Sequence, residues 1–271
     1  MLINIDGEMD TIENILNILV LGTTLLIIIS IIISYILSKR NIKPLIEAYK
    51  KQTEFVQNAS HELRTPLAII QAKQELLLKE PNSKIIDKSK DINLALTETK
   101  RLTRLIKELM DLARADEGSY KLEKKLVNIN ELIKEVSVPY EEMANMQNKK
   151  LILDLSYKKD LNCDKNKMFE LMVIILDNAI KYTLENDEIE IKTYKKDKKC
   201  VIEISDTGIG VSDEDLNHIF DRFYRADKAR TKETGGTGLG LSIARTIVNM
   251  HGGIIYAEHN TPKGIKIIVK I

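Results

Sequence analysis

A histidine and a glutamate stand side by side in the stretch NASHELRTPL, inside a segment whose apolar spacing predicts an amphipathic helix. Pro66 has no N–H to donate to the carbonyl of Glu62, so it would bend or loosen such a helix. Thr65 lies four residues after His61 and shares its face. If Glu62 curls back to hold one ring N–H, the other ring nitrogen is free to act as a nucleophile. The stretch therefore predicts a nucleophilic imidazole, which needs an electrophile.

Two other interpretations of this stretch exist. A zinc-binding helix would carry a second histidine four residues after the first, but position 65 is Thr65. A surface histidine on a bundle helix is the simpler alternative. It leaves the neighbouring Glu62 and Pro66 unexplained.

The segment LDNAIKYT closes an otherwise apolar helix in the second half of the chain. Asn178 offers a carbonyl oxygen suited to Mg²⁺, Lys181 a positive charge for phosphate, and Tyr182 a flat ring for a base. A buried amide at such a position is costly unless it is used. The alternative is a helix that simply ends in polar residues.

Two glycine-rich segments follow. In DTGIGV, Gly208 and Gly210 would let the backbone approach a flat ligand, and Asp206 could accept a hydrogen bond from an exocyclic amine such as that of adenine. In TGGTGLGLS, backbone N–H groups and the start of a helix suit phosphate. A dinucleotide fold would need a strand just before these glycines, and a P-loop would need Gly-Lys-Ser/Thr after them. Neither is present, and we expect residues 206–240 to form a lid.

The elements that must position these residues follow from hydrophobic periodicity. We predict helices over 45–79, 84–115, 130–146, 165–182 and 239–250, and strands over 124–129, 151–157, 188–194, 200–205, 254–258 and 265–271. This order indicates an α+β two-layer sandwich with helices on one face of a mixed sheet. The first two helices, joined by a turn at 80–83 with Ser83 as a cap, form a hairpin. One hairpin cannot cover its own apolar stripe, so we expect two copies to form a four-helix bundle.

Residues 15–37 contain no charged side chain. As a helix they would be ~34 Å long, enough to cross a ~30 Å hydrocarbon core. The preceding flank is acidic and the following flank, ending in Pro44, carries Lys39, Arg40 and Lys43. This bias places the amino terminus outside and the remainder in the cytoplasm of a single-pass cell-membrane protein. A cleaved signal peptide is the alternative, but it would be shorter and begin with a basic flank.

The composition argues against several classes of protein. The 41 basic and 40 acidic side chains among 271 residues give no reason to expect nucleic acid as a partner. Cys163 and Cys200 show no pairing pattern, which argues for a reducing compartment and against a disulfide framework or zinc site.

Taken in order, these segments resemble the sequence boxes of sensor histidine kinases of two-component systems, from Lys39 to Ile271. FVQNASHELRTPL is similar to the H box, LDNAIKYT to the N box, DTGIGV to the first glycine box, IFDRFYR to the F box and GGTGLGLSIA to the second glycine box. The resemblance implies a dimeric helical phosphoacceptor domain followed by an ATP-binding sandwich (Bergerat/GHKL fold) of the type found in Hsp90, gyrase and MutL. We expect a tail (1–14), a membrane helix (15–37), a linker (38–50), a dimerisation and phosphoacceptor domain (51–117) and an ATP-binding domain (118–271).

The resemblance also implies roles for individual residues. His61 would be autophosphorylated from ATP and Mg²⁺, Glu62 would be the base, and Thr65 would help to hydrolyse the phosphoaspartate of a response regulator. Asn178 would bind the metal, with Lys181 and Tyr182 near phosphate and base. Asp206 would read adenine, and the pocket and lid would be shaped and anchored by Gly208, Gly210, Phe220, Phe223, Gly236, Thr237, Gly238, Leu239 and Gly240. For the two phenylalanines, ordinary packing of a short helix is an equal alternative.

Two departures from the family pattern stand out. The N box often has a second Asn four residues before Asn178, where this chain has Ile174, which puts the rate or metal preference in doubt. The front end has about a dozen residues before the predicted span and no room for a sensor domain. Either the span and a membrane partner sense the signal, or an earlier span is missing from the start.

The sequence thus predicts a membrane histidine kinase that phosphorylates His61 and passes the group to a cytoplasmic response regulator. A nucleotide-binding membrane scaffold without kinase activity, suggested by Ile174, and an ATP-driven clamp of the Hsp90 class are the alternatives. Phosphatase action could also dominate.

Overall fold

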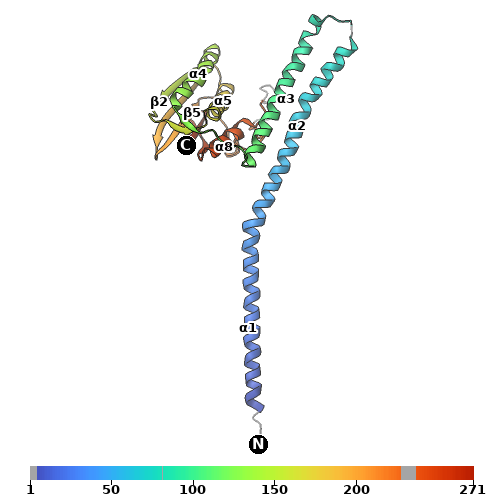
Figure 1. Ribbon diagram of the computed structural model, residues 1–271, viewed down its shortest axis with the longest axis vertical. Helices are drawn as coiled ribbons and strands as arrows, with labels where there is room; N and C mark the ends of the chain where they lie inside the picture. Colours follow the sequence, from blue (N-terminus) through green and yellow to red (C-terminus); the bar gives the residue numbers. More distant parts are fainter. Residues whose placement is uncertain (1–4, 81, 227–235) are drawn as a thin grey trace. The chain divides into compact units, whose positions relative to one another are not determined.

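The computed structural model describes residues 5–80, 82–226 and 236–271, and the chain divides into two compact units, 1–57 and 58–271. The first unit is helical: α1 (Ile5–Leu37), a π-helical turn η1 (Ser38–Ile42), and the start of α2 (Lys43–Lys79) (Figure 1). The N–H of Lys43 donates to the carbonyl of Ser38. Pro44, expected to mark the end of the apolar helix, lies in the first turn of α2, and the wider π-turn comes just before it.

The apolar side chains of α1 are exposed along its length. Thr23 and Thr24 do not break the pattern, because their hydroxyls donate to the carbonyls of Leu19 (2.9 Å) and Val20 (2.7 Å) in their own helix. Within the described residues, this is the one helix whose length and composition would allow it to cross a membrane.

The second unit begins with an antiparallel helical hairpin. Helix α2 continues to Lys79, a short 3₁₀ turn η2 spans Ile85–Lys88, and α3 spans Ser89–Asp116. Lys73 on α2 is 2.7 Å from Asp91 on α3. The prediction that Ser83 caps the second helix is wrong: its hydroxyl donates instead to the Glu80 carboxylate (3.0 Å), and the turn ends in η2.

An α/β sandwich follows the hairpin. Three longer helices, α4 (Ile129–Met146), α5 (Lys165–Tyr182) and α8 (Gly240–Met250), lie together on the sheet (Figure 1). The five-stranded sheet has the order β2-β4-β5-β7-β6, with β2 parallel to β4 and the other pairs antiparallel. Its strands are β2 (Lys150–Leu155), β4 (Glu188–Lys196), β5 (Lys199–Asp206), β6 (Ile254–His259) and β7 (Ile265–Lys270).

Two small elements, β3 (Leu161–Cys163) and the one-turn helix α6 (Asp213–Leu216), were not predicted from the sequence. Strand β3 pairs in a separate ladder with β1 (Lys125–Val127), which lies within the strand predicted over 124–129. Each is too short to show a hydrophobic period. The predicted layers are otherwise present.

Alternation along β4 explains why the helices cover one face of the sheet. Ile189 and Ile191 are fully buried beneath the helices, while Glu188 and Glu190, on the other face, are exposed or half-buried. Helix α5 begins where it does because the Asp164 side chain accepts from the N–H groups of its first turn.

His251 joins the end of α8 to the start of α5. Its Nε2 accepts from the N–H of Asp164 (3.0 Å), and its Nδ1 lies 2.8 Å from the carbonyl of Ile247. This pattern requires a neutral ring with the proton on Nδ1. Burial, with 8% of the residue exposed, lowers the pKa of His251.

We predict that the domain loses stability as the pH falls below ~6.5, because the unfolded chain then binds a proton that the folded ring resists. The loss should reach at most ~1.4 kcal/mol per pH unit and end once the pH has passed the lowered folded pKa. Urea unfolding of the wild type and of His251→Gln at about pH 7.5 and about pH 5.5 checks this. An equal pH effect in both proteins would show that His251 is not the source.

Candidate phosphoacceptor and nucleotide site

His61 lies on the exposed surface of α2. The hydroxyl of Thr65 donates to the His61 carbonyl (3.4 Å), so both residues lie on one face as the spacing predicted. Pro66 is buried, and α2 continues through it to Lys79.

The carboxylate of Glu62 faces two arginines in the described chain. Its Oε2 is 3.7 Å from Arg101 on α3, and its Oε1 is 3.8 Å from Arg225, which follows the short helix α6. No described contact joins the carboxylate to the imidazole of His61, so the proposed orientation of the ring by Glu62 would need a change of rotamer. Glu62 nevertheless connects the helical hairpin to the sandwich through Arg225.

Asn178 is half-buried in the last turns of α5. Its amide Nδ2 donates to the carbonyl of Ile174 (3.0 Å), which leaves the side-chain oxygen as the available ligand atom. Ile174 itself packs toward the second glycine box, because a Cβ at Gly240 would lie 3.3 Å from its Cγ2. The residue that replaces the second Asn is therefore a packing residue here.

Two cations meet beside the end of α5. Burial and then the charge of Arg225 lower the pKa of Lys181, whose Nζ lies 5.1 Å above the ring of Tyr182. The Arg225 Nε is buried and has no hydrogen-bond acceptor among the described residues. No described carboxylate pairs with Lys181. Two neighbouring, partly buried cations of this kind favour an anionic ligand.

Asp206 ends β5 and is only 5% exposed. Its Oδ1 accepts from the N–H groups of Gly208 (2.9 Å) and Ile265 (3.3 Å). No described residue donates to Oδ2. Burial raises the pKa of Asp206, and the nearby Asp187 adds to this. One fixed and one open oxygen is the arrangement expected for a carboxylate that recognises an amine.

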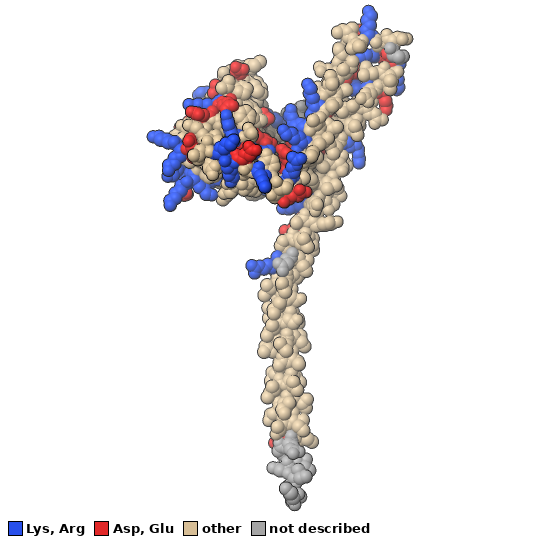
Figure 2. Space-filling model, in the orientation of Figure 1, with Lys and Arg blue, Asp and Glu red and all other residues tan. Residues whose placement is uncertain are grey.

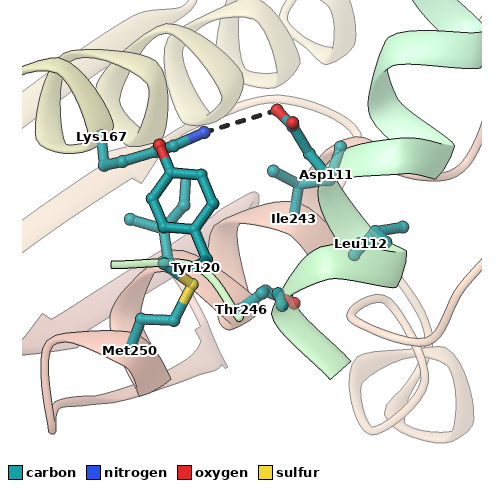
Figure 3. A pocket seen from close by; sticks show the side chains of 9 residues that line it. Asp111, Leu112, Tyr120, Lys167, Ile243, Thr246 and Met250 are labelled. Atoms are coloured by element: carbon teal, nitrogen blue, oxygen red, sulfur yellow. Dashed lines mark hydrogen bonds and ion pairs between the residues drawn. The ribbon is translucent and has the colours of Figure 1, made fainter. Parts of the chain in front are cut away.

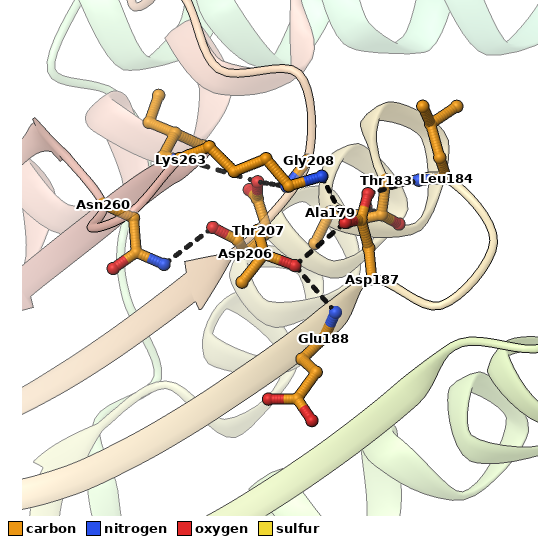
Figure 4. A network of polar contacts seen from close by, with 11 residues as sticks. Ala179, Thr183, Leu184, Asp187, Glu188, Asp206, Thr207, Gly208, Asn260 and Lys263 are labelled. Atoms are coloured by element: carbon orange, nitrogen blue, oxygen red, sulfur yellow. Dashed lines mark hydrogen bonds and ion pairs between the residues drawn. The ribbon is translucent and has the colours of Figure 1, made fainter.

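A polar network behind Asp206 holds three loops together (Figure 4). The Asp187 carboxylate accepts from Lys263 (2.7 Å), from Thr207 (3.1 Å) and from the N–H of Leu184 (2.7 Å). Although burial alone would raise it, these donors together lower the pKa of Asp187. Sequence reasoning missed this buried residue, since its partners lie up to 76 residues away.

Gly208 is required by close packing. A Cβ at this position would collide with the carbonyl oxygen of Tyr182, the same oxygen that accepts from the N–H of Ile209 (3.2 Å). The first glycine box therefore rests directly on the end of α5.

We predict that Gly208→Ala weakens ATP binding at least tenfold and lowers stability by about 1–3 kcal/mol, in the range of overpacking substitutions. Isothermal titration with ATP and urea unfolding measure the two effects. Thr207→Ser, which keeps the hydroxyl of the neighbouring residue, is the control. Unchanged affinity in a folded Gly208→Ala protein would remove this glycine from the site.

The second glycine box contacts the F box. Gly238 has a φ of +74° and its carbonyl accepts from the N–H of Phe223 (2.9 Å), and a Cβ at Gly238 would lie 2.8 Å from the Phe223 backbone. Gly236 faces Lys181, whose Nζ would be 2.7 Å from a Cβ there. Leu239 is buried. Gly210 also has a positive φ, of +66°.

Phe220 is buried beneath the guanidinium of Arg245, 5.0 Å from the ring centre. Residues 227–235, the middle of the expected lid, lie outside the described residues. The lid and the anchoring roles of Phe220 and Phe223 stay predictions.

Helix α3 contacts the sandwich through acidic residues on one face. Asp116 accepts two hydrogen bonds from Arg222 (2.7 and 2.8 Å), and Glu108 accepts from Thr237 (3.1 Å). Lys167, at the start of α5, points toward Asp111 of α3 and lies over the ring of Tyr120 (Figure 3). Its Nζ is 3.4 Å from the Asp111 carboxylate and 4.8 Å from the centre of the Tyr120 ring. These contacts place the second glycine box against the hairpin.

A helical hairpin with an exposed histidine, followed by an α/β sandwich that carries the candidate residues Asn178, Lys181 and Asp206, indicates a class of protein. The chain belongs to the sensor histidine kinases. Residues 51–118 match the His Kinase A (phospho-acceptor) domain, and residues 163–271 match the histidine kinase-, DNA gyrase B- and HSP90-like ATPase domain.

Particular relatives agree. The chain is 39% identical to the sensor protein CiaH of Streptococcus pneumoniae over 245 residues, 90% of this chain and 54% of that one. It is 37% identical to the signal transduction histidine-protein kinase ArlS of Staphylococcus aureus over 227 residues, 80% of this chain and 48% of that one. The crystal structure of histidine kinase ThkA in complex with response regulator protein TrrA matches with a TM-score of 0.64 and 26% identity, covering 88% of this chain and 65% of that one. The chain thus spans about half the length of the curated relatives it matches.

Proposed function

We propose that the chain is a membrane-anchored histidine kinase that transfers the γ-phosphoryl group of ATP to His61 and then to an aspartate of a response regulator. The observation that carries the proposal is that one site offers both a pair of cations, Lys181 and Arg225, and an open oxygen on Asp206. The two parts are joined by Gly208, which packs on the Tyr182 carbonyl and donates to Asp206. This combination suits a ligand with an anionic end and an amine-bearing end. ATP has both.

In this proposal, Asp206 accepts from the exocyclic amine of adenine and Tyr182 lies against the base. Lys181 and Arg225 bind the phosphates, and the N–H groups of residues 236–240 add donors at the start of α8. Arg225 was not predicted from the sequence. A signal for it exists, since it closes the F box two residues after Phe223.

Asn178 would hold Mg²⁺ through its side-chain oxygen, and the orientation set by its bond to Ile174 supports this. The ion supplies charge neutralisation on the phosphates when bound. Because the Ile174 side chain has no oxygen and its carbonyl already accepts from Asn178, water and phosphate would complete the coordination.

The phosphoryl step forms a bond between a ring nitrogen of His61 and the γ-phosphorus. The bond from that phosphorus to the bridging oxygen breaks, and ADP leaves. By resemblance, Glu62 takes the ring proton, and Thr65 positions a water in the hydrolysis of the regulator's phosphoaspartate. In such chemistry the protein mainly positions groups and balances charge.

We infer that two copies pair through the hairpin. Large apolar side chains on α3 stay exposed in the single chain, among them Leu96 (54%) and Met110 (50%). A second hairpin would bury them in a four-helix bundle. The family of the phospho-acceptor domain supports the same arrangement.

We infer that α1 spans the cell membrane, with the kinase domains in the cytoplasm. Residues 15–37 are uncharged, and Lys39, Arg40 and Lys43 follow them. The apolar side chains of α1 are exposed in the structure, as a lipid-facing helix requires.

One experiment separates this function from its alternatives. The full chain, in detergent or vesicles, is incubated with γ-labelled ATP and Mg²⁺ and then with a purified receiver domain. A kinase acquires acid-labile, base-stable label and passes it on. A scaffold binds ATP without label, and a clamp of the Hsp90 class releases free phosphate steadily. Either of the last two results would overturn the proposal.

A further inference from the structure

Six lysines gather at one end of the five-stranded sheet. We call this set the lysine end: Lys158, Lys159, Lys195, Lys196, Lys198 and Lys199. All six are exposed. The near-zero net charge of the whole chain hides this local excess, and Figure 2 shows lysine and arginine side chains projecting from the sandwich.

Strand pairing brings the two segments together. The hairpin between β4 and β5 carries four of the lysines, and the loop after β2 carries the other two. Leu155 at the end of β2 lies opposite Thr193, and the N–H of Ser156 donates to the Thr193 carbonyl (2.9 Å). The nucleotide side is at the other end of these strands, where Ile189 pairs with Asp206. The lysine end is therefore separate from the candidate site.

The lysine end is not neutralised from within. Other lysines on the same sheet have carboxylate partners, such as Lys192 with Glu190 (2.7 Å) and Lys150 with Glu188 (3.1 Å). None of the six has an ion pair with a described residue, although Asp160 and Asp197 lie in the same loops. Six positive charges in one region repel one another, and binding of an external anion would offset this repulsion.

The turn between β4 and β5 places one of the six lysines in an unfavourable backbone conformation. Asp197 and Lys198 have φ values of +50° and +67°. Aspartate is common in this conformation at the first of two turn positions, whereas the second position favours glycine. Lys198 thus occupies a position where glycine would be less strained.

We propose that the lysine end binds the anionic lipid headgroups of the membrane in which the chain is anchored. This rests on the proposed membrane span of α1. Anchoring raises the local concentration of headgroups around the sandwich, so weak contacts suffice. Headgroup attraction needs only positive charge, roughly fivefold in binding per lysine near the surface.

Nucleic acid fits the lysine end less well. Lysine can neutralise the phosphates of nucleic acid, but bidentate contacts to phosphate favour arginine and single-strand binding also relies on exposed aromatic rings. The six residues include no arginine, and Tyr157, which precedes them, is buried. Lipid is the occupant that the chemistry favours.

The test uses the full chain in vesicles of phosphatidylcholine, with or without phosphatidylglycerol, containing a lipid-attached quencher. A fluorophore is placed at Asp160→Cys, beside the lysine end. Cys163 and Cys200 are buried, and burial raises their thiol pKa values to about 11 and about 12, so they react slowly with the label. A separate fluorophore at Thr24→Cys reports insertion of α1.

We compare K195Q/K196Q/K199Q with the control K121Q/K125Q/K134Q, which removes three exposed lysines elsewhere on the sandwich. Lys198 is left unchanged because of its φ. Phosphatidylglycerol should increase quenching at position 160 several-fold in the wild type and the control, and salt should reverse the increase. The lysine-end variant should lose most of it.

Equal quenching in both vesicle types, equal loss in the control, or a response to added duplex DNA in place of lipid would overturn the proposal. Quenching at position 24 is scored separately, so a failure of the membrane anchor is recognised as such. Label incorporation from ATP, measured on the same samples, distinguishes failure of the kinase function. The lysine-end variant should keep that label.

Discussion

Replacing His61 with glutamine is expected to abolish the acid-labile label that the full chain acquires from ATP. Glutamine has a similar size but offers no nucleophilic ring nitrogen. Because His61 is exposed on α2 and supports no described packing, the variant should fold and bind ATP as the wild type does. Label incorporation should fall at least a thousandfold, to background, which corresponds to about 4 kcal/mol or more of lost transition-state stabilisation.

A matched control is available in the same chain. His259 is also exposed, and its Nε2 lies 2.6 Å from the Asp213 carboxylate. His259→Gln should keep full labelling. Label that persists in His61→Gln, or that disappears in His259→Gln, would mean that the phosphoacceptor has been assigned to the wrong residue.

The second large effect is expected at Asp206. In Asp206→Asn the side-chain oxygen can still accept from Gly208 and Ile265, so the local fold is kept. The other position becomes an NH₂ group that opposes the adenine amine, and two donors then face each other. An unpaired buried donor costs about 1–3 kcal/mol, so ATP affinity should fall about tenfold to about a hundredfold.

Equilibrium binding of ATP measures this effect, and urea unfolding checks that Asp206→Asn is folded. Asp154→Asn, which changes an exposed carboxylate on β2, is the control and should bind as the wild type does. ATP binding by Asp206→Asn with unchanged affinity would show that this carboxylate does not read the base.

Much of the fold could be predicted because its helices are long and periodic. Helix α5 begins and ends at the residues predicted from the apolar pattern, and the strands of the sheet alternate as predicted. The short β3 and α6 could not be predicted, because three or four residues carry no period. Their positions depend on pairing with distant segments.

The candidate site could be predicted in type but only partly in detail. The motifs identify Asn178, Lys181 and Asp206 because each of these residues lies near the end of its own helix or strand, within a short stretch of sequence. Glu62 has two partners, Arg101 and Arg225, and tertiary structure alone brings them close to it. The support that Asp187 and Lys263 give to the first glycine box likewise joins loops that are far apart in sequence.

The most direct test of the whole account is to locate the phosphoryl group on the unmodified protein. The full chain in vesicles is incubated with ATP and Mg²⁺, digested at alkaline pH and sequenced by tandem mass spectrometry, with ATP binding measured on the same preparation. The account predicts phosphohistidine at position 61. A preparation that binds ATP with Mg²⁺ but never carries phosphate on that residue would contradict it.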